Sequence, residues 1–210
     1  MNLIKFSVIA SLFCALSISA QAQNVKPKFK KFILVSYRPS GSGNKQFVRI
    51  ENYREIDENG ILYRSDNSFN DYYGDLTYDG RTTDTTYRIP DSLIIALNKV
   101  FNGSKKLTEH MITNKLPPGA NFAGPFEFIA YTANDNTSDN LVIVPSFIDD
   151  EIRSLLEKIW RLPHSRIWKA GRVYRNKVIE AQVLKNHKAS KYVPEIVEPP
   201  RVKELILKSN

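Results

Sequence analysis

Residues 141–161 read LVIVPSFIDDEIRSLLEKIWR and join a strand directly to a helix. The first four residues are apolar throughout, which predicts a strand in a central position of a sheet, covered on both faces. Beyond Pro145 the apolar residues recur at helical spacing and three acids stand near the start, which predicts a helix over 147–161. Ser146 and Asp149 resemble a capping box at its N-terminus. The expected buried stripe consists of Ile148, Ile152, Leu155, Leu156 and Ile159.

The first 90 residues predict an antiparallel β-meander. Short runs rich in β-branched and aromatic residues alternate with turn signals such as Glu58-Asn59-Gly60 and Asp79-Gly80. Runs that are neighbours in sequence stand close enough to pair as hairpins. The expected strands are Phe32–Tyr37, Phe47–Ile50, Ile61–Tyr63, Asp75–Tyr78 and Thr82–Ile89.

A first helix is expected after Pro90, where apolar residues from Leu93 to Phe101 follow helical spacing. Further strands come before and after the two helices. We therefore expect an α+β fold with an N-terminal antiparallel β-meander followed by two amphipathic helices interleaved with further strands. Two of these strands are expected at Phe126–Thr132 and Leu141–Val144, Ile167-Trp168 could pair with Val173-Tyr174, and Lys177–Leu184 stays open between strand and helix.

Residues 185–210 predict an extended basic tail that packs on the domain. Pro194 and the pair Pro199-Pro200 exclude a continuous helix through this part of the chain. Its content of Val, Ile and Leu is too high for a purely solvated arm. The chain is therefore divided into a signal peptide (1–22), a single α+β domain (23–184) and the tail (185–210).

Residues 1–22 have the pattern of a secretory signal peptide. Lys5 precedes an almost unbroken apolar run from Phe6 to Ile18, and small residues end the segment at Ala22. We expect cleavage after Ala22 and a secreted or periplasmic product that begins at Gln23. The apolar run is shorter than the roughly 20 residues that span a bilayer, so no transmembrane segment is expected after cleavage.

The formal net charge of +8 is distributed unevenly. Basic residues exceed acidic ones in 23–56 and in 153–210, and acidic residues exceed basic ones in 57–152. This pattern is typical of a domain whose own segments attract one another. For an exported protein, an anionic envelope polymer, a glycan or a peptide is the expected partner, and nucleic acid is not expected. The oligomeric state stays open.

The sequence lacks the common catalytic and cofactor motifs. It has no Gly-x-Ser-x-Gly elbow, His-Glu-x-x-His, phosphate-binding loop or dinucleotide fingerprint. Its only cysteine, Cys14, lies in the leader, which removes thiolate chemistry and disulfides from the mature protein. The polar loop Asn134–Asn140 lacks the glycine and the glutamate of a calcium loop. We therefore expect no catalytic residues, no cofactor and no metal site.

A tyrosine-rich acidic stretch is the strongest ligand-binding signal in the sequence. Flat aromatic faces beside carboxylates are suited to holding sugars or peptides. The competing explanation is that tyrosine simply favours half-buried strands. The candidate ligand-binding residues are Tyr63, Tyr72, Tyr73, Tyr78, Asp71 and Asp75.

These observations predict an exported, non-catalytic binding or envelope-accessory protein whose ligand is a glycan or a peptide. A first alternative is a secreted hydrolase that uses carboxylates and a histidine. It requires His110 or His164 to share one cleft with two of the acids Asp71, Asp75, Asp149 and Glu151. A second alternative is a structural or assembly protein that docks through its basic C-terminal segment.

Overall fold

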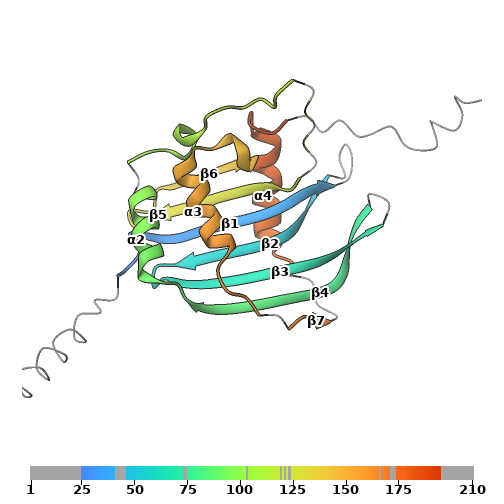
Figure 1. The fold of residues 1–210 in the computed structure, drawn as a ribbon, viewed down its shortest axis with the longest axis horizontal. Coiled ribbons are helices and arrows are strands. Elements are labelled where there is room, and N and C mark those ends of the chain that lie inside the picture. The colour runs from blue at the N-terminus through green and yellow to red at the C-terminus, as the bar shows by residue number, and fades with distance from the viewer. Residues whose placement is uncertain are drawn as a thin grey trace, which may run out of the picture.

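The protein is built on one seven-stranded antiparallel sheet with the strand order β6-β5-β1-β2-β3-β4-β7 (Figure 1). The sheet with its helices confirms the expected α+β class. No helix among the described residues is long and apolar enough to cross a bilayer. The expected leader and cleavage site lie outside the described residues. The computed structural model describes residues 25–40, 46–72, 75–102, 104–118, 120, 122, 124–165, 167–170 and 174–194, without the side chains of 69–79.

The predicted meander is present, and its strands are longer than expected. Each consecutive pair is antiparallel, and β1 and β2 stay paired from Lys31 opposite Asp57 to Ser40 opposite Phe47. β1 carries a continuous apolar run at Phe32–Val35 because both faces of the sheet are covered there. The four strands are β1 (Phe29–Ser40), β2 (Phe47–Asp57), β3 (Ile61–Tyr72) and β4 (Asp75–Arg88).

The predicted turn at Gly80 is wrong, because β4 runs through this residue as a single strand. Asn67 pairs with Thr82, whereas Phe69 pairs with Tyr78, so the register shifts and β4 bulges between these pairs. Gly80 has φ of +75°, a left-handed conformation that favours glycine. The turn signal therefore marks a bulge within a strand.

β5 (Phe126–Ala133) and β6 (Ser138–Ile143) form the predicted second hairpin, and β5 pairs with β1. This places β1 in the interior of the sheet, between β5 and β2. β6 lies at an edge, so its expected central position is wrong. Its apolar sequence has another cause, because Leu141 and Ile143 pack in the core on one face and Val142 in the core on the other.

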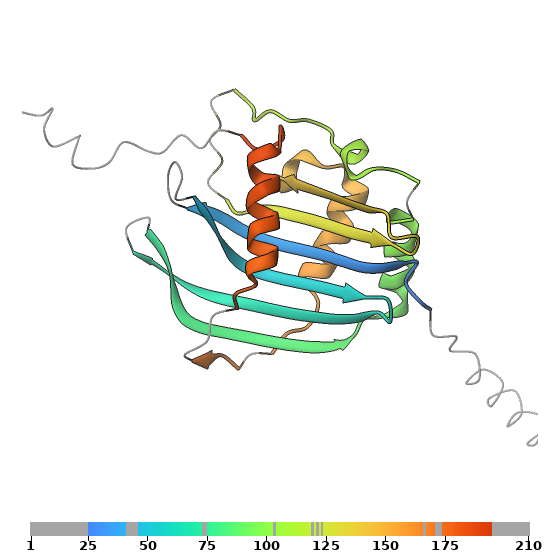
Figure 2. The same cartoon turned by 180° about the vertical axis from the view of Figure 1, so that it is seen from behind.

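Helices cover the sheet on both faces. The predicted helices α2 (Asp91–Val100) and α3 (Asp150–Trp160) lie on one face, and α4 (Lys177–Ala189) lies on the opposite face (Figures 1 and 2). Short 3-10 helices occupy Leu107–His110 and Pro145–Phe147. Two apolar cores result, one on each face of the sheet. The α2/α3 core includes Phe32, Leu34, Ile129 and Leu155, and the α4 core includes Val35, Tyr37, Phe128 and Val183.

Two details at the ends of the helices differ from expectation. Asp149, and not Ser146, caps α3, because its side chain accepts a hydrogen bond from the amide of Ile152. α4 continues five residues beyond 184, so the prediction of extended chain from 185 is wrong up to Ala189. The reason is that Val183 is buried against the sheet and His187 reaches the hydroxyl of Tyr37 at 2.8 Å.

The segment between α3 and α4 follows the β4 edge of the sheet. β7 (Lys169–Ala170) pairs with Arg81 and Thr82 of β4. The pairing expected between Ile167-Trp168 and Val173-Tyr174 stays a prediction, because Val173 lies outside the described residues. The last part of the predicted tail, 195–210, also lies outside them.

Candidate functional site

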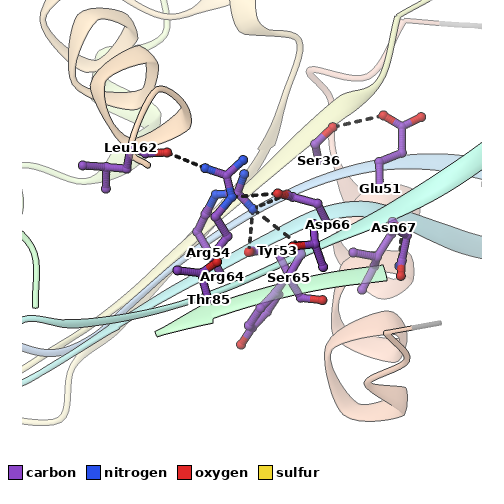
Figure 3. Close-up of polar contacts among 12 residues, drawn as sticks. Ser36, Glu51, Tyr53, Arg54, Arg64, Ser65, Asp66, Asn67, Thr85 and Leu162 are labelled. Atoms are coloured by element: carbon purple, nitrogen blue, oxygen red, sulfur yellow. Dashed lines mark hydrogen bonds and ion pairs between the residues drawn. The ribbon is translucent and has the colours of Figure 1, made fainter. Parts of the chain in front are cut away.

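A cluster of three charged side chains is buried on the α3 face of the sheet, where β2 and β3 lie side by side. Both Arg54 and Arg64 donate to the carboxylate of Asp66, at 2.6 Å from Nη1 of Arg54 and 2.7 Å from Nε of Arg64 (Figure 3). Arg64 also donates to the carbonyl of Leu162, just beyond α3. All three side chains are almost wholly buried, Arg54 with only 1% exposed.

The cluster holds two cations against one anion. Burial lowers the pKa of Arg54 to about 10, an effect that the charge of Arg64 increases and that Asp66 opposes. Nε of Arg54 has no acceptor among the described residues. The cluster therefore carries one net positive charge.

Trp160, the last residue of α3, connects this cluster to a carboxyl group on β5. The guanidinium of Arg54 lies over the indole ring, 4.9 Å from its centroid. The indole Nε1–H donates to Oε1 of Glu127 at 2.7 Å. The tryptophan thus presents its ring face to a cation and its polar edge to an acid.

Glu127 lies at a cavity of about 220 Å³ between α3 and the sheet. Its neighbours Phe126 and Phe128 belong to the α4 core, so strand alternation turns Glu127 toward α3. Only 8% of the residue is exposed, and Oε2 is buried without a donor among the described residues. The cavity is lined by Glu127, Pro145, Ser146, Ile148, Arg153, Leu156, Glu157 and Trp160.

Burial also makes the carboxyl group of Glu127 harder to ionise. It raises the pKa of Glu127 to about 7, although the hydrogen bond from Trp160 acts in the opposite direction. Across the cavity, Nη2 of Arg153 contacts Oδ1 of Asp150 at 2.8 Å and the carbonyl of Ile148 at 3.0 Å, while its buried Nε has no acceptor among the described residues. A perturbed acid at a cavity is typical of a binding or catalytic site.

Tyr63 is the one predicted ligand-binding residue whose side chain the structure describes, and it lies on the other face of the sheet. Its ring centroid is 6.0 Å from that of Tyr53 and 6.0 Å from that of Tyr174. The three rings pack the segment before α4 against the sheet. Four other candidates lie in the β3–β4 hairpin, where the structure describes the backbone but not the side chains: Asp71, Tyr72, Asp75 and Tyr78. Tyr73 lies outside the described residues.

The residues of the hydrolase alternative are only partly brought together. His110 is buried and its Nδ1 lies 2.7 Å from Oδ2 of Asp149. Glu151 instead pairs with Lys99, and His164 is exposed. Among the described residues, no three His, Cys, Asp or Glu side chains gather in a group that could hold a metal ion.

The contact between His110 and Asp149 joins the start of α3 to the 3-10 helix Leu107–His110. We expect Asp149→Ala to lower the free energy of unfolding by about 0.5–2 kcal/mol, because the cap of α3 is lost together with the partner of His110. Asp149→Asn keeps an oxygen in the capping position, so it should lower the free energy of unfolding by less than Asp149→Ala does. Urea unfolding of the three proteins measures both effects, and equal losses for the two variants would contradict the capping role.

Sequence reasoning did not identify Glu127, Arg153 or the Arg54 cluster. One signal was present, because Glu127 interrupts the apolar run of β5 between two phenylalanines. Its partner Trp160 stands 33 residues further along the chain. Comparisons with protein-family models, with curated proteins and with solved structures found no match for this chain.

Proposed function

We propose that this chain is an exported, non-catalytic binding protein that holds a small ligand in the cavity at Glu127. One observation carries the proposal: a cavity of about 220 Å³ is lined by apolar side chains together with Glu127, a buried carboxyl group whose pKa is raised by burial to about 7. A cavity that combines apolar walls with an acid of perturbed pKa is typical of a binding site. Export is supported by the signal-peptide pattern of residues 1–22.

The ligand is a fragment of a glycan or of a peptide, as the expected location in the cell envelope suggests. The walls of the cavity suit such a ligand, because Ile148, Leu156 and the indole of Trp160 offer apolar surface beside a few polar groups. The hydrolase alternative receives less support, because His110 and Asp149 are not among the residues that line the cavity.

The binding proposal is tested by blocking the cavity. The purified protein is incubated with the small-molecule fraction of an enzymatic envelope digest, washed and analysed by native mass spectrometry. We expect a bound small molecule in the wild type and its loss in Ser146→Trp, because Ser146 is exposed at the cavity. The matched control is Ser104→Trp, an exposed serine outside the cavity lining, which should retain the ligand. Equal retention by all three proteins, or by none, would refute the site.

The export proposal has its own test. When the chain is expressed with its leader in a bacterium, the product outside the cytoplasm should begin at Gln23. N-terminal sequencing measures this directly, and a membrane-embedded product that still begins at Met1 would exclude cleavage.

A further inference from the structure

The outer side of α4 carries three lysines in one narrow arc. Lys177, Lys185 and Lys188 are exposed, and at 3.6 residues per turn they lie within an arc of about 80° around the helix axis. The arc points away from the sheet, because the buried residues Ile179 and Val183 lie on the opposite side of the helix. Its exposed residues are here called the α4 lysine face: Lys177, Val178, Ala181, Lys185, Lys188 and Ala189.

The charges of the α4 lysine face are not neutralised within the described part of the chain. None of its three lysines has an ion-pair partner among the described residues. Glu180 is the only acid between residues 174 and 194, and Arg175 donates to both of its carboxylate oxygens, at 2.7 and 2.8 Å. On the opposite side of the sheet, α3 has acids that pair with its own arginines. The α4 lysine face is therefore open to an external anion.

The geometry of the α4 lysine face suits a flat partner. Figure 2 shows α4 crossing in front of the sheet, with α2 and α3 behind it. Because the three lysines share one arc of a single helix, their ammonium groups can contact one plane at the same time. A planar anionic surface therefore meets all three charges without any change in the fold.

The chemistry of the α4 lysine face favours the headgroups of anionic phospholipids. Clusters of basic residues on a helix are typical of binding to anionic lipids. All three cations are lysines, whose compact charge on a flexible stem needs no fixed acceptor geometry. Val178, with an exposed fraction of 76%, adds apolar contact beside the charges. A glycan would favour flat aromatic side chains, and the six residues of the α4 lysine face include none.

From these observations we infer that the α4 lysine face binds the surface of a bilayer that contains anionic phospholipids. In this orientation the sheet separates the bilayer from α3. The cavity at Glu127, on the α3 side, stays open to the aqueous phase. The inference does not depend on what the cavity binds.

Binding is measured by sedimentation of the mature chain with large vesicles. One set contains phosphatidylcholine alone, and the other contains roughly one third phosphatidylglycerol, which gives the surface a negative potential. We expect binding to the second set only. Binding should weaken as the salt concentration is raised, because salt screens exposed charges.

Substitutions on α4 should weaken binding in steps. A lysine near an anionic bilayer contributes about fivefold to partitioning, so Lys185→Gln should weaken binding about fivefold. Substituting glutamine for all three lysines of the α4 lysine face should weaken it about a hundredfold.

The matched control substitutes glutamine for three exposed lysines outside α4 and so lowers the net charge by the same amount: Lys28, Lys105 and Lys158. This control should bind within about threefold of the wild type, because charges further than a Debye length of about 10 Å from the bilayer contribute little.

The orientation is tested by NMR with nanodiscs that contain phosphatidylglycerol and a lipid with a nitroxide headgroup. The nitroxide should broaden the backbone amide signals of Val178 and Ala181 on α4. The amide signals of Ser154 and Lys158, which are exposed on α3, should keep their intensity.

Equal binding to the two sets of vesicles, binding to neither, or equal losses in the two triple variants would overturn the inference. Binding to the anionic polymer dextran sulfate but not to vesicles would also overturn it, because the partner would then be a polyanion. Each of these results leaves the proposed function intact, because that function is tested at the cavity with Ser146→Trp.

Discussion

Asp66→Asn is expected to lower the free energy of unfolding by about 3–5 kcal/mol, the largest effect of any single substitution considered for this protein. The substitution leaves the guanidinium groups of Arg54 and Arg64 buried without a counter-ion. Equilibrium unfolding in urea at neutral pH measures the loss. The matched control is Asp84→Asn, which removes a more exposed carboxylate 3.4 Å from Lys169 and should cost no more than about 1 kcal/mol.

A second variant keeps this prediction testable if Asp66→Asn does not fold. In the triple variant Arg54→Met, Arg64→Met and Asp66→Leu, all three charges are replaced by apolar side chains of similar volume. We expect it to fold with a stability close to that of the wild type, because no buried charge is left unpaired. A triple variant that is less stable than Asp66→Asn would show that the cluster stabilises the fold beyond charge balance.

The stability of the protein is expected to fall as the pH rises from about 4.5 to about 7. The pKa of Glu127 is about 7 in the folded protein, against an ordinary value of 4.5, so the folded state holds this proton more tightly than the unfolded state. Raising the pH through this window removes the proton from the unfolded chain first and so favours unfolding. Each unit of pKa shift corresponds to about 1.4 kcal/mol, giving a total of roughly 3 kcal/mol.

The measurement compares wild type and Glu127→Gln by urea unfolding at a series of pH values. Glutamine does not titrate, so the difference between the two proteins isolates Glu127. The comparison is needed because His187 also titrates near this pH range. Burial lowers the pKa of His187, so its neutral form contributes stability that is lost as the pH falls. A difference in stability that stays constant between pH 4 and pH 8 would mean that Glu127 has an ordinary pKa in the folded protein.

Local sequence patterns predicted most of the fold, and their failures have physical reasons. Runs of β-branched and aromatic residues between turn signals located β1 to β3 and the β5–β6 hairpin, and helical spacing located α2 and α3. The strand at Leu141 was placed at the centre because an apolar run records burial on both faces, and helices can bury an edge strand as fully as a central one. Gly80 was read as a turn because a turn and a bulge share the same requirement for positive φ.

The candidate site could not be predicted in the same way, because its properties arise only in the folded protein. A glutamate on a strand is ordinary until Trp160 and Arg153 of α3 close over it. The same holds for Arg54, whose burial depends on β3 and on the end of α3. Tyr63 stays a ligand-binding prediction, and the structure shows that its ring packs near those of Tyr53 and Tyr174.

The interior position of β1 determines when the sheet can be completed during synthesis. One of its edges pairs with β2, a close neighbour in the chain, but the other pairs with β5, which begins almost a hundred residues later. A nascent chain that ends before residue 126 therefore has all four meander strands and still leaves β1, with its buried run from Phe32 to Tyr37, with an open edge. Non-local pairing of this kind slows folding and exposes strands to intermolecular association. The edge of β1 thus stays open to intermolecular pairing until β5 has been synthesised.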